Sequence, residues 1–157
     1  MITRVALAVA TVGGVGYVPI APGTFGSAVG VLVWWLLGGS AVVQSVAIVA
    51  IFAAGVWSGG VCERECRRTD PGHVVIDEVA GMLITLWLAP VAWAGAFGAF
   101  VLFRIADVIK PYPANRLEAL HGGFGIMADD AMAAVYANLA LRAILGAIHL
   151  LGHRVIG

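Results

Sequence analysis

The chain has 157 residues, and its nine basic and nine acidic residues give a formal net charge of zero. Only 11% of the residues are charged and 61% are hydrophobic, whereas an ordinary soluble domain carries roughly 25% charged residues. The length suits one domain, expected over residues 1–157, and the neutral balance argues against a basic nucleic-acid-binding surface. The two cysteines, Cys62 and Cys66, are too few for a disulfide framework or a cysteine metal site.

Charged residues stand in clusters that are separated by long uncharged runs. Three runs contain no Asp, Glu, Lys or Arg: residues 5–62, 79–103 and 131–141. A charge in hydrocarbon costs roughly several kcal/mol, so this pattern is typical of a membrane protein. The alternative is a soluble helical protein with a large core.

The N-terminal stretch MITRVALAVATVGGVG has one basic residue and a short apolar run. Three glycines interrupt that run and no A-x-A-like cleavage site follows it, so we expect no cleaved signal peptide. Apolar runs bounded by helix breakers predict helices along the whole chain. In order, these cover about residues 2–12, 26–37, 41–67, 77–88, 91–109 and 129–151, with a short helix over 114–120.

The Ala89-Pro90 pair interrupts the apolar run between two acids, Asp77 and Asp107. One straight helix would hold these acids about 45 Å apart at 1.5 Å per residue, too far to share a site. A bend at Ala89-Pro90 returns them to one side, and its first arm of ~10 residues is too short to cross a bilayer of about 30 Å. We therefore predict an all-α fold, a compact bundle of about six helices that is partly or wholly membrane-embedded, with an acidic site at one face of helix ends.

Five of the nine acidic residues fall in three short segments, IDEVAGM, FRIADVIKPYP and IMADDAM. The pairs in the first and last segments have a simple explanation, because acids at a helix start accept backbone N–H bonds and suit the helix dipole. The five acids are Asp77, Glu78, Asp107, Asp129 and Asp130.

Asp107 lies within a predicted helix, with Arg104 and Lys110 three residues away on either side. The three side chains face the same way, so a local ladder of ion pairs is one explanation. A hard-cation site is the other, because Mg²⁺ takes oxygen ligands and binds through carboxylates together with substrate phosphate. Arg104 and Lys110 would then hold the remaining phosphate charge.

Two glycine-bearing stretches, APGTFGS and HGGFGIM, add candidate phosphate contacts. In the first, Thr24 and Ser27 present hydroxyls at a predicted helix start, where backbone N–H groups bind anions; a plain turn with a helix cap is the alternative. In the second, Gly122 and Gly123 permit close approach of the backbone to a ligand. His121 beside them could donate a proton or bind phosphate, or it is a loop histidine without a role.

Four segments in this order, PGTFGS, DEVAGM, FRxxDxxKPxP and HGGFGIMxDD, resemble the phosphatidylglycerophosphatase A family. The resemblance covers about residues 11–140, and Phe25 and Tyr112 stand where the family often has tryptophan. It implies an all-helical enzyme that uses Mg²⁺ to remove the terminal phosphate of phosphatidylglycerophosphate, giving phosphatidylglycerol. We expect a multi-pass protein of the bacterial inner membrane whose site faces the cytoplasm, because positive residues favour that side. Those residues are Arg64, Arg67, Arg68, Arg104, Lys110 and Arg116.

The resemblance also implies roles for the candidate residues, with the lipid phosphate and the bilayer as partners and no nucleic acid. Metal ligands are expected among Asp77, Glu78, Asp107, Asp129 and Asp130. Phosphate contacts are expected from Thr24, Ser27, Arg104, Lys110, Gly122 and Gly123. Catalytic roles are expected for Asp107, Asp130, Arg104, Lys110 and His121, and either a metal-oriented water or a carboxylate could attack phosphorus.

Two alternatives come from other functional classes. A small transporter or cation channel would use intramembrane acids as ion sites, but those lie inside spans, whereas these acids stand at span ends. A small assembly protein without activity is the second alternative. The motif sets of CDP-alcohol phosphotransferases and of lipid phosphatases with a histidine nucleophile do not occur in the sequence.

Overall fold

The fold is helical throughout the part of the chain that the computed structural model describes, residues 2–69, 71–117 and 119–156, with side chains up to Leu151. Within these residues there are seven α-helices and one short 3-10 turn and no strand, so the predicted all-α fold is confirmed. The elements are α1 Ile2–Ala10, η1 Val15–Tyr17, α2 Pro22–Leu37, α3 Ala41–Cys66, α4 Ile76–Leu86, α5 Trp93–Ile109, α6 Ala114–Leu117 and α7 Gly123–Ile156.

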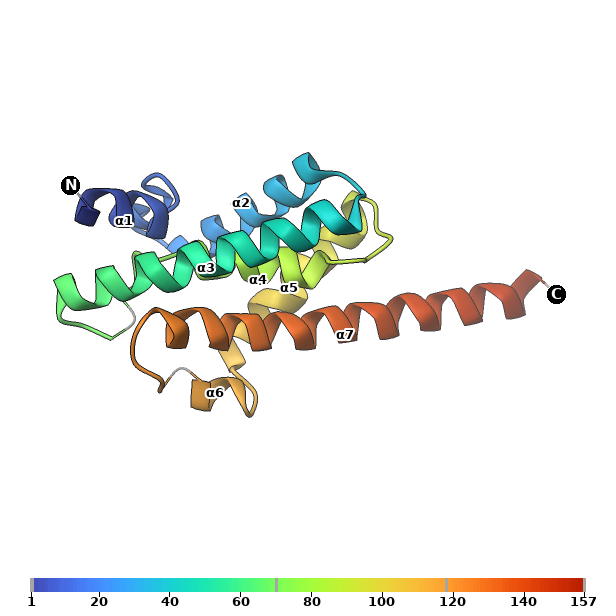
Figure 1. Ribbon diagram of the computed structural model, residues 1–157. Helices are drawn as coiled ribbons and strands as arrows, with labels where there is room; N and C mark the ends of the chain where they lie inside the picture. The colour runs from blue at the N-terminus through green and yellow to red at the C-terminus, as the bar shows by residue number, and fades with distance from the viewer. Residues whose placement is uncertain (1, 70, 118, 157) are drawn as a thin grey trace.

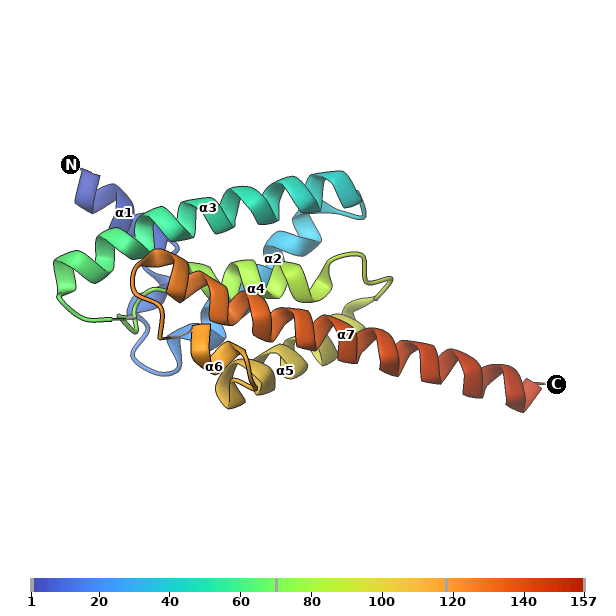
Figure 2. The ribbon, with the colours of Figure 1, turned by 60° about the horizontal axis from the view of Figure 1, so that its bottom comes forward.

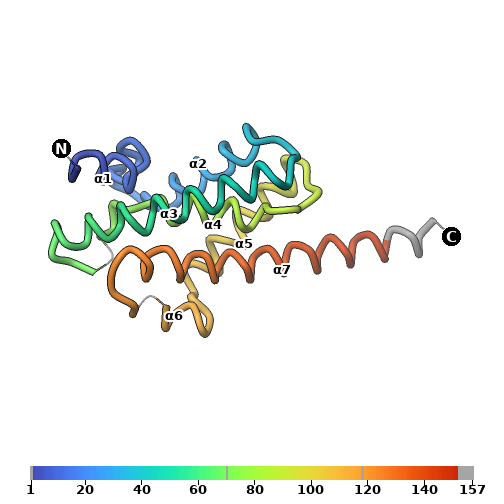
Figure 3. The backbone as a smooth tube through the Cα atoms, in the orientation of Figure 1, coloured from blue at the N-terminus to red at the C-terminus, as the bar shows by residue number. Residues whose placement is uncertain are grey.

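Helix α4 is the central element of the bundle. It contacts α2, α3, α5 and α7, and nearly all of its side chains are buried. Helices α3 and α7 follow the long direction of the molecule, and α7 extends past the other helices (Figures 1 and 3). Five alanines in the main core allow α5 and α7 to approach closely, as small residues do in membrane bundles. This core consists of Met82, Leu86, Ala96, Ala99, Phe103, Ala133, Ala134, Ala137 and Leu141.

Two helices begin earlier than predicted. Helix α2 starts at Pro22 rather than near residue 26, because proline is pre-organised for the first turn of a helix, where its missing N–H costs nothing. Helix α7 starts at Gly123 rather than near residue 129. Most of the HGGFGIM stretch is therefore helical, and Asp129 and Asp130 lie about two turns into α7.

Contacts with α3 account for the early start of α7. The amide nitrogen of Gly122 donates to Oε2 of Glu63 at 2.7 Å, so a side chain of α3 takes the place of a local cap. Gly123 lies against the carbonyl oxygen of Val56, and a Cβ atom at this position would collide with that oxygen and with the amide nitrogen of Gly60. The two glycines thus serve the packing of α7 on α3.

The chain bends between α4 and α5, as the Ala89-Pro90 pair predicted. Helix α4 ends at Leu86 and α5 begins at Trp93, and both helices pack on α7. The bend returns Asp107 to the end of the bundle where Asp77 lies, so both side chains line one pocket. Helix α6 lies at this same end, together with the last turns of α3 and the first turns of α7 (Figures 1 and 2). The predicted acidic site at one face of helix ends is confirmed.

Two polar side chains of α7 stabilise this bend. Nδ2 of Asn138 donates to the carbonyl oxygens of Thr85 at 2.8 Å and Trp87 at 3.0 Å. Nη2 of Arg142 donates to the carbonyl oxygens of Trp87 at 3.0 Å and Leu88 at 3.2 Å. The last carbonyls of a helix have no partner within it and apolar surroundings offer none, so these bonds stabilise the end of α4.

Among the residues that the structure describes, two helices are long and apolar enough to cross a membrane, Ala41–Cys66 of α3 and Gly123–Leu151 of α7. The 26 residues of α3 extend about 39 Å, more than the ~30 Å of a bilayer core. The 11 residues of α4 extend only about 16 Å, and this helix is packed on protein instead, as predicted for the short arm. The length and the apolar composition of α3 and α7 thus indicate membrane association.

Candidate functional site

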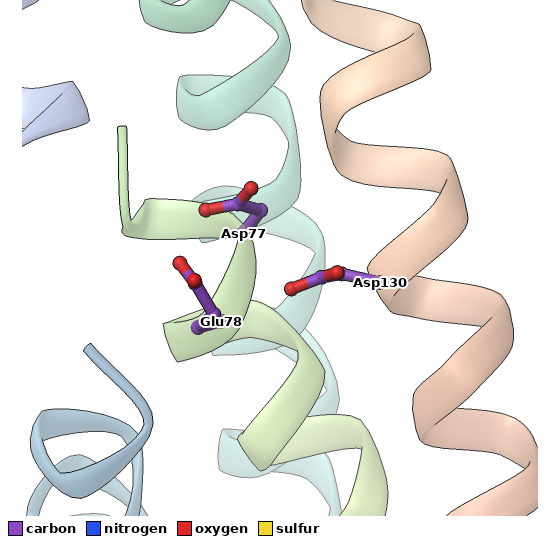
Figure 4. Close-up of side chains that lie close together, drawn as sticks. All are labelled: Asp77, Glu78 and Asp130. Atoms are coloured by element: carbon purple, nitrogen blue, oxygen red, sulfur yellow. The ribbon is translucent and has the colours of Figure 1, made fainter. Parts of the chain in front are cut away.

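Helices α4, α5 and α7 bring all five predicted acids and two predicted cations to one pocket of about 200 Å³. Figure 4 shows Asp130 on α7 pointing toward Asp77 and Glu78 on α4. The five carboxylates outnumber the two cations by three, so the pocket carries an excess of negative charge. Its charged lining consists of Asp77, Glu78, Asp107, Asp129, Asp130, Arg104 and Lys110.

Asp77, Glu78 and Asp130 form the closest group of acids. One carboxylate oxygen from each lies within 4.8 Å of the other two. Oε2 of Glu78 and Oδ2 of Asp130 are buried, and no hydrogen-bond partner among the described residues reaches either atom. Such buried oxygens are costly in the ionised form unless a cation binds them, and otherwise burial favours protonation of the carboxyl. The donor set fits Mg²⁺, which binds carboxylate oxygens and keeps several waters, and it lacks the Cys and His ligands that zinc favours.

Each cation of α5 binds a carboxylate. Nη1 of Arg104 lies 2.7 Å from Oδ2 of Asp107 and 3.8 Å from Oε1 of Glu78. Lys110 ends α5 in the left-handed region with φ 46°, and its Nζ lies 2.7 Å from Oδ2 of Asp129 on α7. The ion pairs therefore extend beyond the local ladder that the spacing within α5 predicts.

The two cations are more exposed than the carboxylates that they bind. The side chains of Arg104 and Lys110 are 22% and 21% exposed. The carboxylates that they bind are deeper, with exposures of 13% for Glu78, 12% for Asp107 and 6% for Asp129.

The surroundings of Glu78 favour its protonated form. Burial raises the pKa of the Glu78 carboxyl above its ordinary value, because the charged form loses hydration. A hydrogen bond with Asp77 lowers this pKa, the nearby charge of Asp107 raises it, and the charge of Arg104 lowers it, with burial dominating. A cation bound beside Glu78 would favour the ionised form again.

The first turns of α2 make room for this arrangement. A Cβ atom at Gly23 would collide with Oε1 of Glu78 and come within 3.1 Å of Nη1 of Arg104. The buried Ser27 donates to the carbonyl oxygen of Gly23 at 2.9 Å and accepts from Nη1 of Arg104 at 3.5 Å. The PGTFGS segment therefore supports an acid and a cation of the site, a role that its turn-like sequence did not reveal.

Besides Ser27, four residues with predicted roles toward phosphate do not line the described pocket. Thr24 is half-buried in the first turn of α2, and His121 is exposed just before α7. Gly122 and Gly123 contact α3, as described above. The roles expected of these four residues toward phosphate stay predictions.

Helix capping does not account for all of the acids. Asp77 and Glu78 lie in the first turn of α4 and suit its dipole, but the N-cap residue is Val75, whose side chain makes no capping hydrogen bond. Asp129 and Asp130 lie too far into α7 to cap it, which corrects the expectation that they stand at a helix start.

Gly72 and Val74 line the pocket from the segment before α4, although no sequence pattern singled them out. The amide nitrogen of Val75 donates to the carbonyl oxygen of Ala10 at 2.9 Å, so this segment is attached to the end of α1. The Pro71-Gly72 pair is a local turn signal, but it does not indicate a site.

Comparison with known proteins shows the family of the chain. The sequence profile of the family described as phosphatidylglycerophosphatase A matches residues 8–145. Phosphatidylglycerophosphatase A of Haemophilus influenzae is 37% identical over 138 residues, which cover 83% of this chain and 83% of that protein. Phosphatidylglycerophosphatase A of Escherichia coli is 34% identical over 143 residues, covering 89% of this chain and 79% of that protein.

A third relative carries a different substrate in its name. This Bacteroides thetaiotaomicron protein, with the provisional name phosphatidylinositol-3-phosphatase, is 37% identical over 137 residues, covering 82% of this chain and 86% of that protein. No solved structure matches the chain. The transporter alternative has no support among these relatives, because all three are named as phosphatases.

Proposed function

The chain belongs to the phosphatidylglycerophosphatase A family and is a phosphatase, and from this premise we propose that it removes the terminal phosphate of phosphatidylglycerophosphate with the help of Mg²⁺. In the overall reaction the phosphate ester bond breaks, the hydroxyl of water joins phosphorus, and the proton goes to the glycerol oxygen of the departing phosphatidylglycerol. The observation that carries the proposal is a group of three close carboxylates that shares one pocket with two cations.

Arg104 and Lys110 would bind the phosphate oxygens. Their partial exposure in the pocket lining supports this role, since an incoming dianion can compete with the carboxylates of Asp107 and Asp129 for them. Those two acids would hold the cations in position before the substrate arrives. Phosphoryl transfer depends mostly on positioning and on electrostatic stabilisation of the phosphoryl oxygens, which this arrangement would supply.

Asp77, Glu78 and Asp130 would hold the Mg²⁺. The bound ion would neutralise phosphate oxygens and orient or acidify a water. The buried oxygens of Glu78 and Asp130 support this assignment. A carboxylate of the pocket would accept the proton of the attacking water, or would attack phosphorus itself and then be released by water.

The membrane placement is also part of the proposal. With α3 and α7 across the bilayer, the acidic pocket lies at one membrane surface and the loop at residues 38–40 at the other. Arg64, Arg67 and Arg116 belong to the helix ends near the pocket, which supports a cytoplasmic position for it. The ring centroids of Trp35 and Trp93 lie 6.0 Å apart toward the opposite end, as expected of aromatic residues at a membrane surface.

Purified protein in detergent provides the direct test. We expect release of inorganic phosphate from phosphatidylglycerophosphate in the presence of Mg²⁺, loss of that release in excess chelator, and recovery when Mg²⁺ or Mn²⁺ is restored. Phosphatidylinositol-3-phosphate serves as the comparison substrate, since one relative carries its name. Faster release from the inositol lipid would contradict the proposed substrate, and full turnover in chelator would contradict the metal.

A further inference from the structure

An apolar groove of about 330 Å³ lies between α2 and α5, outside the acidic pocket. Its lining consists of Ala28, Val31, Trp93, Ala96, Phe97 and Phe100. The groove is open at its side, because Ala28 is exposed and Phe97 and Trp93 are 70% and 57% exposed. Small side chains on both helices leave this space between larger aromatic ones.

The groove follows the same helix faces that approach the charged pocket. On α5, Trp93, Phe97, Phe100 and Arg104 are spaced by four, three and four residues, so they form one stripe that runs from the groove to the cation. From Phe100 to Trp93 this stripe extends about 10 Å away from Arg104.

The facing stripe on α2 has the same spacing. Thr24, Ala28, Val31 and Trp35 follow one another along it, and Ser27, next to Ala28, already contacts Arg104 at 3.5 Å. The two stripes thus begin beside the charged pocket and run away from it in parallel. At the far ends of the two stripes, the ring centroids of Trp35 and Trp93 lie 6.0 Å apart.

We infer that this groove binds an acyl chain of the lipid whose phosphate occupies the acidic pocket, an inference that rests on the proposed function. A lipid phosphate monoester joins a dianion to long apolar chains. The charged pocket suits the dianion, and the apolar groove, which the stripes on α2 and α5 connect to the pocket, suits a chain. An acyl chain in the groove packs against the aromatic rings and adds contacts that a soluble phosphate ester lacks.

The Ala28→Phe variant tests the inference by filling the groove from an exposed position that avoids the core. Phosphate release would be measured with dioleoyl and with dihexanoyl phosphatidylglycerophosphate in the same detergent. We expect kcat/KM for the dioleoyl lipid to fall about tenfold or more, while that for the dihexanoyl lipid changes less than about twofold. The matched control is Ala53→Phe, which adds the same ring at an exposed position of α3 and should leave both values unchanged.

Equal loss on both lipids, or no loss on either, would overturn the inference. A second measurement does not depend on turnover: a lipid phosphate with a photoactivatable diazirine in its acyl chain should crosslink to α2 and α5 near Ala28, Phe97 and Phe100. Crosslinks confined to α3 and α7 would also overturn it. A wild-type protein that crosslinks in the groove but releases no phosphate would contradict the proposed function alone.

Discussion

Nζ of Lys110 lies 2.7 Å from Oδ2 of Asp129, although the two residues are 19 positions apart and belong to the end of α5 and the body of α7. This ion pair distinguishes the two adjacent aspartates of α7. Asp129 binds a cation of the protein, while Asp130 belongs to the close group with Asp77 and Glu78. The two residues therefore have different expected roles, although the sequence places them side by side.

The first prediction compares these two aspartates. Asp130→Asn removes a charge from the expected Mg²⁺ ligands, so activity per folded molecule should fall on the order of a hundredfold or more, with a higher Mg²⁺ requirement. Asp129→Asn should change the apparent affinity for the lipid phosphate more than the Mg²⁺ requirement, because it releases Lys110. Phosphate release during a Mg²⁺ titration measures both effects. Glu65→Gln, an exposed acid on α3, is the control, and a normal Mg²⁺ curve for Asp130→Asn would contradict the ligand assignment.

The second prediction concerns the space that Gly23 leaves for Glu78. In Gly23→Ala the added methyl group must displace Oε1 of Glu78, the far end of a flexible side chain, which is expected to lower activity about tenfold or more while stability changes little. Gly98→Ala on α5 is the matched control, because its Cβ atom would meet no atom within 4 Å and alanine favours a helix. Activity and thermal unfolding in detergent measure both effects. Equal behaviour of the two variants would show that Gly23 has no steric role.

The third prediction concerns the bend between α4 and α5. Asn138→Leu keeps a similar volume but removes the donor to the carbonyl oxygens of Thr85 and Trp87, so stability should fall by about 1–3 kcal/mol. Asn115→Leu changes an exposed asparagine of α6 and should have little effect. Thermal unfolding in detergent compares the two variants, and an unchanged midpoint for Asn138→Leu would show that water or lipid headgroups replace these bonds.

The fourth prediction follows from the raised pKa of Glu78. A carboxyl whose pKa is higher in the folded state contributes stability below its unfolded pKa, which is about 4.3 for glutamate, and that contribution is lost as pH rises through the folded value. In chelator, the stability of the protein should therefore decline as pH rises above the ordinary glutamate range. Glu78→Gln should reduce this slope, and Glu65→Gln should not. With Mg²⁺ present the decline should become smaller, since the ion binds the ionised acids.

The fifth prediction concerns membrane sidedness. A Cys66→Ser background removes the exposed thiol and leaves the buried Cys62. In this background, a membrane-impermeant thiol reagent should label Asn115→Cys only from the cytoplasmic side and Gly39→Cys only from the opposite side, because the 26 residues of α3 separate these ends. Labelling of both positions from one side would contradict the crossing of the bilayer by α3.

The sequence by itself determined the helical class, the bend and the set of charged residues. These features depend on local properties: long uncharged runs exclude most soluble arrangements, and the Ala89-Pro90 pair interrupts a helix wherever it occurs. Once the bend was predicted, Asp77 and Asp107 had to return to one end of the bundle. The five acids that meet in the pocket stood out by their clustering in three short segments, and the resemblance to the family implied the same set.

Only the tertiary structure decided which of these residues touch. The start of α7 depends on Glu63 of α3, the carboxylate of Glu78 needs the space at Gly23, and Lys110 reaches Asp129 across a helix boundary. Each of these contacts joins elements that are distant in sequence. Helical periodicity specifies which face of each helix is apolar, but the packing of side chains between helices determines the depth and rotation at which those faces meet.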